Sequence, residues 1–115
     1  TLSLTEKVYS FSTLAEMITA FKDNEYWRGR IWAPLNFLVY LGLNNYEFPE
    51  VRHAFAEKSQ KLLLKSWLSH GYVFENYNAL TGEGDDVVRS DKFYHWGALL
   101  GYIALIENGV VSKCN

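Results

Sequence analysis

The feature that most constrains the fold is a nearly uninterrupted apolar run from Ile31 to Leu43, which contains Pro34 and Asn36. Its 13 residues are too few for a membrane span, which takes about 20 residues in a helix. Pro34 fits the first turn of a helix, where its missing N–H costs nothing. The run therefore predicts a helix over 33–43 with almost no polar face, and such a helix has to be buried on most sides.

Three more segments have the apolar spacing of helices. After Thr13, apolar residues recur at i, i+3, i+4 and i+7, and Thr13 with Glu16 forms a capping-box pattern, which predicts a helix over 13–22. Another helix is expected over 49–69, because the segment opens with a proline and is followed by a glycine suited to a left-handed C-cap. The last helix is expected over 94–107. We therefore predict an all-α chain of about four helices.

The stretch over 72–91 is predicted to be a long loop that contains Gly82, Gly84, Asp85 and Asp86. Loops of this length are uncommon inside compact chains and are usually functional. The acidic residues faintly resemble a calcium-binding loop, but the ligand spacing of an EF-hand is absent. A solvated turn is the better interpretation, and we predict no metal site.

Other signatures of cofactor binding are absent from the sequence. The three histidines are far apart, a single cysteine, Cys114, lies next to the end, and there is no G-x-G-x-x-G segment or P-loop. We therefore expect no cofactor. The lone cysteine and the absence of any Asn-x-Ser/Thr sequon fit a cytoplasmic protein.

Composition and charge narrow the class of protein. The 115 residues suffice for one domain, and 49% hydrophobic with 21% charged residues is typical of a globular chain. Eleven basic and thirteen acidic side chains give a net charge of −2, which argues against a nucleic-acid-binding surface. Aromatic residues make up 17%, and such rings stack on the apolar faces of sugars as well as filling cores. A start without methionine suggests a processed chain or an excised piece.

The segment YWRGRIW at 26–32 places Trp27, Arg28 and Trp32 just before the apolar helix. Flat indole rings suit a sugar face, and a guanidinium group suits hydroxyl or carboxylate oxygens, so these three residues are candidates for a binding pocket. The alternative is that both tryptophans belong to the core and that the arginine forms a structural ion pair.

Glu75 is the candidate catalytic carboxylate. It ends a short apolar run and lies among aromatic residues. A carboxylate in such a place is either paired with an arginine or held to act on water. Glu83 is the rival carboxylate, but its two glycine neighbours favour an exposed turn.

Three segments together resemble the C-terminal portion of glycoside hydrolase family 63: YWRGRIW at 26–32, ENYNALTGEG at 75–84 and FYHWGALL at 93–100. That family comprises processing α-glucosidases and relatives that act on mannosylglycerate or glucosylglycerate. The resemblance implies an (α/α)6 barrel of the six-hairpin glycosidase type, in which residues 1–115 form the C-terminal part of the catalytic domain, incomplete on its own. It also implies hydrolysis of α-glycosidic bonds in an oligosaccharide or a small glycoside, with inversion.

The resemblance also implies residue roles. Glu75 occupies the position of the family's catalytic base. Further positions match residues that line the sugar site or surround the base: Trp27, Arg28, Trp32, Asn76, Tyr77 and Trp96.

The chain departs from the family pattern at the catalytic acid. Inversion needs two carboxyl groups about 6.5–9.5 Å apart, and the family's acid is an aspartate well upstream of these segments. The aspartates of this chain lie in other contexts: Asp23, Asp85, Asp86 and Asp91. The chain therefore holds half of a catalytic pair, and we expect it to be inactive alone.

Two classes of function remain open at this point. One is the C-terminal part of an inverting α-glucosidase-like hydrolase, and the other is a non-catalytic helical module that binds carbohydrate or another protein. The helix over 33–43 has too few partners in a four-helix piece. We expect the remainder of the barrel, on the same or another chain, or self-association to cover it, and we expect neither nucleic acid nor a membrane as a partner.

Overall fold

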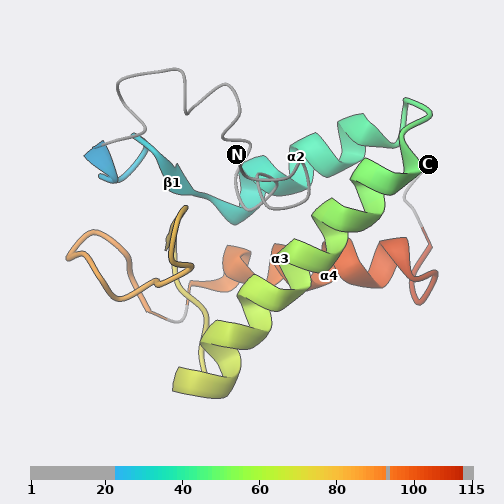
Figure 1. Cartoon of the computed structure of the whole chain (residues 1–115). Helices are drawn as coiled ribbons and strands as arrows, with labels where there is room; N and C mark the ends of the chain where they lie inside the picture. Colours follow the sequence, from blue (N-terminus) through green and yellow to red (C-terminus); the bar gives the residue numbers. More distant parts are fainter. Residues whose placement is uncertain (1–22, 93, 113–115) are drawn as a thin grey trace.

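The computed structural model describes residues 23–92 and 94–112, which form three crossing α-helices and a small two-stranded sheet at one side of them (Figure 1). The helices are α2 (Ala33–Leu43), α3 (Pro49–His70) and α4 (Leu99–Glu107). The helix predicted over 13–22 lies outside the described residues. None of the helices in the described segments is both long and apolar enough to cross a membrane.

The boundaries of α2 and α3 confirm the predicted ones. Proline occupies the first turn of each helix. At the end of α2 the side-chain amide of Asn44 donates to the carbonyl of Tyr40 at 2.8 Å. At the end of α3 Gly71 has a φ of 75°, and its N–H donates to the carbonyl of Trp67 at 2.8 Å. Both helices therefore stop where the local sequence predicts, because the capping groups lie next to the helix end.

The rest of the structure differs from the prediction in two places. The segment predicted as one helix over 94–107 begins as a 3-10 helix, η3 (His95–Ala98), before α4. Two short strands, β1 (Arg30–Ile31) and β2 (Tyr77–Asn78), pair antiparallel, whereas the sequence predicts helices and a loop alone. Strands of two residues are too short to show an alternating pattern, so only the folded chain reveals their pairing. The described chain is nonetheless mostly helical.

Two groups of buried apolar side chains hold these elements together. The first group joins the sheet and the loop to the helices: Ile31, Ala33, Leu62, Phe74, Tyr77, Ala79 and Leu100. The second group fills the space among the three helices: Tyr40, Phe55, Ala56, Ile103 and Ile106. The strand pairing thus lies directly on the helical core, which fixes the position of the loop that follows β2.

The helix α2 is not buried on most sides by the described residues. Leu35, Leu38 and Leu41 are 49%, 62% and 41% exposed, respectively. Trp67 of α3, which belongs to that helix's apolar pattern, is also 55% exposed. This apolar surface corrects the expectation of burial, and its physical reason is the shortage of partners that the sequence already indicates.

Candidate active site

The site forms where the segment before α2 meets the loop after α3, at the side of the molecule that carries β1 (Figure 1). Arg30 pairs with Asn78, and Ile31 pairs with Tyr77 in the β1–β2 ladder. The ladder therefore brings the YWRGRIW and ENYN segments side by side, although they are far apart in the sequence.

Two glycines allow the chain to pass close to Phe74, the residue before Glu75. A Cβ atom on Gly84 would overlap the Phe74 ring, and a Cβ atom on Gly97 would lie 2.9 Å from the Phe74 carbonyl oxygen. Any side chain at either position would push the segment outward. The glycines of the TGEG and HWG segments thus explain how three separate stretches converge at the candidate base.

The carboxylate of Glu75 is held by two uncharged donors. The Tyr26 hydroxyl donates to Oε1 at 3.3 Å, and the Asp91 backbone N–H donates to Oε2 at 3.3 Å. The residue is 7% exposed. Within 23–92 and 94–112 no basic side chain forms an ion pair with it. The sequence allows Glu75 either to pair with an arginine or to act on water. Among the described residues, no arginine pairs with it.

The backbone of Glu75 is fixed as firmly as its side chain. Its N–H donates to the carbonyl of Asp91 at 2.9 Å, and its carbonyl accepts the indole N–H of Trp96 at 3.2 Å. These bonds tie the segment to η3 and to the end of the loop. The position of the carboxylate is therefore set by contacts on both sides of the peptide.

Glu75 lines a pocket of about 410 Å³ together with Tyr26, Val88, Arg89 and Asp91. The Arg89 guanidinium lies 5.9 Å from the centre of the Tyr26 ring. A carboxylate, a phenol and a guanidinium around one small hollow are the kinds of groups that bind and activate polar substrates.

The two tryptophans of the YWRGRIW segment have different environments. Their rings stack with centres 3.5 Å apart and planes 13° apart. Trp27 is 55% exposed, whereas Trp32 is 1% exposed and its indole N–H donates to the Tyr26 carbonyl at 2.8 Å. Trp96 is half-buried and meets Trp32 edge-on at 5.9 Å. Trp27 therefore presents a flat aromatic surface, and Trp32 supports it from the inside.

Arg28 and Arg30 have opposite environments. The Arg28 side chain is 64% exposed and pairs with Asp23 at 2.6 Å. The Arg30 side chain is fully buried and its Nη2 pairs with Asp86 Oδ1 at 2.7 Å. Its Nε donates to the side-chain oxygen of Asn76. Arg30, which the sequence analysis does not single out, is thus the arginine inside the site's framework.

The charge of Asp86 is stabilised by this framework. Burial alone raises the pKa of its carboxyl group, but hydrogen bonds from Arg30, Asn78 and Asn24 outweigh burial and lower the pKa below its usual value. The ion pair of Arg30 with Asp86 therefore stays ionised at neutral pH and connects β1 to the loop.

Asn76 and Tyr77 are fully buried beside the candidate base. The Asn76 amide Nδ2 donates to the carbonyl of Arg89 at 2.7 Å, and the Tyr77 hydroxyl accepts the N–H of Phe74 at 2.9 Å. Neither side chain reaches the surface of the described structure. Their polar groups hold the chain before and after Glu75.

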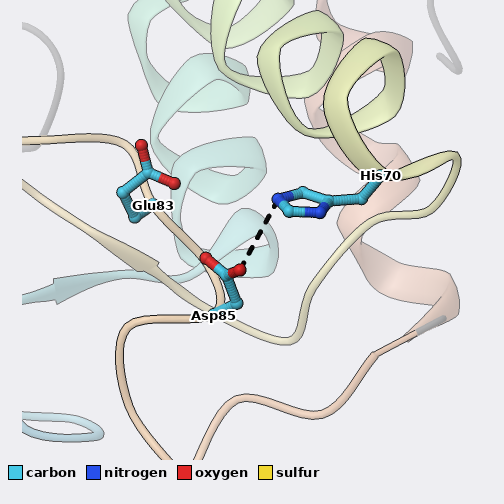
Figure 2. A group of neighbouring side chains, drawn as sticks. All are labelled: His70, Glu83 and Asp85. Carbon is cyan, nitrogen blue, oxygen red and sulfur yellow. Dashed lines mark ion pairs between the residues drawn. The ribbon is translucent and has the colours of Figure 1, made fainter.

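The rival carboxylate, Glu83, has a cationic partner. Its Oε1 lies 2.8 Å from Lys65 Nζ, and its side chain is 43% exposed. Figure 2 shows Glu83 on the same loop as Asp85, which faces the His70 ring at the end of α3 with 3.7 Å between the paired atoms. One ligand atom from each of these three residues lies within 4.8 Å of the others. Because the Lys65 ammonium already neutralises Glu83, we assign no metal there.

A second, larger hollow of about 900 Å³ lies between α3 and α4. Its lining is mainly apolar and includes Leu63, Leu64, Leu99, Tyr102 and Leu105. No carboxylate of the described residues lines it. The smaller pocket at Glu75 is therefore the candidate active site, and the larger groove belongs to the exposed apolar surface.

The sequence motifs predict no site role for Tyr26, Arg30 and Asp91, which the structure places in the site or its framework. Tyr26 opens the YWRGRIW segment, and this was the one available signal for it. The contacts of the other two depend on partners far away in the sequence. Only the folded chain reveals such contacts.

Tyr26 thus links the two features of this site, because its hydroxyl donates to Glu75 and its ring contacts the exposed Trp27. Residues 2–106 match the Glycosyl hydrolase family 63 C-terminal domain, and the chain belongs to this family. The resemblance seen in the three sequence segments is thereby confirmed.

Two kinds of relatives match the chain over part of their length. It is 33% identical over 93 residues to the mannosyl-oligosaccharide glucosidase of Saccharomyces cerevisiae, which covers 69% of this chain and 11% of that protein. It is 34% identical over 64 residues to two mannosylglycerate hydrolases of Selaginella moellendorffii, which covers 56% of this chain and 12% of each relative. The chain thus spans about a ninth of the length of these relatives. No solved structure matches it significantly.

Proposed function

We propose that the chain is the C-terminal part of the catalytic domain of an inverting glycoside hydrolase that cleaves α-glycosidic bonds, with Glu75 as the general base. The observation that carries the proposal is the carboxylate of Glu75, which lines a pocket and accepts hydrogen bonds from two uncharged donors. A carboxylate whose partners among the described residues are two uncharged donors keeps lone pairs for a water molecule.

In the proposed reaction Glu75 takes a proton from a water molecule in the pocket. The oxygen of that water attacks the anomeric carbon from the side opposite the leaving group, and the glycosidic C–O bond breaks. A carboxylic acid then gives its proton to the leaving oxygen. The exposed ring of Trp27 would pack against a sugar ring and help to orient it.

The acid of this reaction is proposed to come from outside the chain. Asp23, Asp85 and Asp86 each have a basic partner. Asp91 also lines the pocket, but its backbone N–H donates to the Glu75 carboxylate. The Asp91 side chain therefore leaves the backbone close to that carboxylate. An inverting pair instead needs carboxyl groups on opposite faces of the sugar.

The rest of an (α/α)6 barrel is the partner that we propose for the exposed apolar surface. That surface consists of the outer face of α2 and the groove between α3 and α4. The chain spans 11% of the yeast relative, so the longer protein has ample chain to cover it. The names of the relatives suggest an oligosaccharide or a small glycoside as substrate.

The test compares Glu75→Gln with the matched variant Glu83→Gln in the full-length protein. Substrates are a glucosylated mannose oligosaccharide, mannosylglycerate and 4-nitrophenyl α-glucoside. Loss of the base is expected to lower kcat by about 10²–10⁴-fold with KM nearly unchanged, because general-base catalysis contributes factors of this size. Glu83→Gln is expected to keep most of the activity. Near-normal kcat in Glu75→Gln would assign the role to another residue, and Asp91→Asn would then be the next variant to assay.

A non-catalytic carbohydrate-binding module is the second candidate, and the exposed Trp27 favours it. Such a module would bind the same glycosides without turnover. Calorimetric binding by a full-length protein that hydrolyses none of the three substrates, abolished by Trp27→Ala, would support this alternative against the proposed hydrolase.

A further inference from the structure

Tyr26 has an unusual backbone conformation for its residue type. Its φ is 49°, in the left-handed region that a bulky side chain rarely adopts. It occupies a tight turn closed by two hydrogen bonds between Glu25 and Arg28, at 2.9 and 2.7 Å. Glycine is the ordinary residue where a turn needs a positive φ. The chain instead keeps a strained tyrosine, and such strain tends to occur at functional sites.

The tyrosine side chain is held from several directions. Its ring meets Trp27 edge-on at 5.7 Å and Trp32 edge-on at 4.9 Å. The backbone carbonyl of Tyr26 accepts the Trp32 indole N–H. The Arg89 guanidinium lies near the ring. These contacts leave the phenol little freedom, so the direction of its hydroxyl is set by the turn and by the tryptophans.

That hydroxyl donates to Glu75 Oε1 at 3.3 Å. Burial first, and then the charge of Glu75 and this hydrogen bond, raise the pKa of the Tyr26 phenol. The phenol therefore remains a donor throughout the neutral range. Since Asp91 N–H binds Oε2, each carboxylate oxygen has one protein donor and a lone pair left for water.

We propose that Tyr26 is a positioning residue for Glu75, which orients the carboxylate toward the attacking water through its hydroxyl. The inference rests on the proposed role of Glu75 as base. It explains why a strained turn carries a tyrosine, and it gives the stacked rings of Trp27, which is exposed, and Trp32, which is buried, a second task, the support of the phenol. Hydrogen bonds in a free active site are often long and tighten when substrate binds.

The test is Tyr26→Phe in the full-length protein, which removes one oxygen atom and keeps the ring. The matched control is Tyr46→Phe, because Tyr46 is 64% exposed and far from the site in the fold. With mannosylglycerate and 4-nitrophenyl α-glucoside as substrates, Tyr26→Phe is expected to lower kcat about 10- to 100-fold, the effect of losing one hydrogen bond to a charged group. KM is expected to change little.

The pH profile separates positioning from a merely structural role. A carboxylate that loses a donor holds its proton more tightly. The acidic limb of kcat/KM is therefore expected to move to higher pH in Tyr26→Phe and to stay in place in Tyr46→Phe. The other titratable groups around the pair, Arg89, Asp91 and Tyr94, are the same in both variants.

The two single variants together distinguish failure of this inference from failure of the proposed function, and a double variant tests their coupling. If Glu75→Gln lowers kcat as expected but Tyr26→Phe leaves kcat and the acidic limb unchanged, the positioning role is overturned while the base stands. If Glu75→Gln retains turnover, the proposed base is wrong and the inference falls with it. In the supporting outcome, adding Tyr26→Phe to Glu75→Gln causes no further loss of kcat, because the hydroxyl acts through the carboxylate.

Discussion

Arg30 connects the two halves of the site through its side chain. The buried guanidinium donates to Asp86 of the loop, to Asn76 beside the candidate base and to Asn24 before the turn. Removing one member of such a buried network is strongly destabilising, because the remaining polar groups are left desolvated and unpaired. Arg30 thus holds Asn76, the residue next to Glu75, whereas the carboxylate of Glu75 accepts hydrogen bonds from Tyr26 and Asp91.

Replacing Arg30 by methionine tests this network. Arg30→Met is expected to lower the free energy of unfolding of the domain by about 3–5 kcal/mol, because Asp86 loses a buried ion-pair partner. Arg28→Met removes the same group from an exposed pair and is expected to cost less than about 1 kcal/mol. Urea denaturation of the full-length variants measures both. Equal effects at the two positions would contradict the assignment of Arg30 as the structural arginine.

The three helices are joined at one carboxylate, at the end of α4. Glu107 accepts hydrogen bonds from the Tyr40 hydroxyl of α2 at 2.6 Å and from Arg52 Nε of α3 at 2.9 Å. His53 Nδ1 lies 3.0 Å away. Burial alone raises the pKa of Glu107, but the bonds from Tyr40 and Arg52 outweigh it and lower the pKa. Polar contacts thus complement the apolar packing among these helices.

Tyr40 provides a pH test of that junction. Burial, then the hydrogen bond to Glu107, raises its pKa from 10.0 to about 12. The neutral phenol therefore contributes stability that is fully present below pH 10 and is lost as pH rises toward about 12. Tyr40→Phe is expected to abolish this part of the alkaline loss, as measured by urea unfolding over that range. The exposed Tyr46→Phe is the control, and an alkaline loss undiminished in Tyr40→Phe would exclude the junction as its source.

At the scale of the whole molecule, large apolar side chains gather on the exposed surface of the described residues. Leu35, Leu38 and Leu41 line one face of α2, and a groove of about 900 Å³ opens between α3 and α4. Exposed patches of this kind are typical of interaction surfaces. The rest of the barrel, which we propose as the partner of this surface, would cover it.

The isolated 115-residue chain is therefore expected to self-associate and to hydrolyse none of the three glycosides. Association follows from the apolar face, and inactivity follows from the proposed position of the acid outside the chain, since losing an acid costs about 10²–10⁴-fold. Sedimentation velocity and an end-point sugar assay check the two parts. The variant Leu35→Lys with Leu38→Lys is expected to reduce association without restoring activity. Turnover by the isolated chain that Glu75→Gln abolishes would show that the acid lies within it.

Local patterns in the sequence determined the bounds of α2 and α3 and the family. Each of these helices has a proline at its start and a capping residue at its end, Asn44 for α2 and Gly71 for α3. These residues act on their neighbours in the sequence, so their effects can be predicted before the fold is known. The three segments that resemble the family are also local strings. Glu75 could be singled out for the same reason, because its aromatic neighbours are adjacent in the chain.

Tertiary structure alone decided which side chains of those segments are buried, exposed or paired. YWRGRIW contains two arginines and two tryptophans, and nothing in the string shows that Arg30 is buried while Arg28 is exposed, or that Trp27 covers Trp32. These outcomes follow from the pairing of β1 with β2 and from contacts to Asp86. The physical reason is that the burial of a side chain depends on contacts with residues tens of positions away in the sequence. A two-residue strand is too short to show a pattern that predicts its pairing.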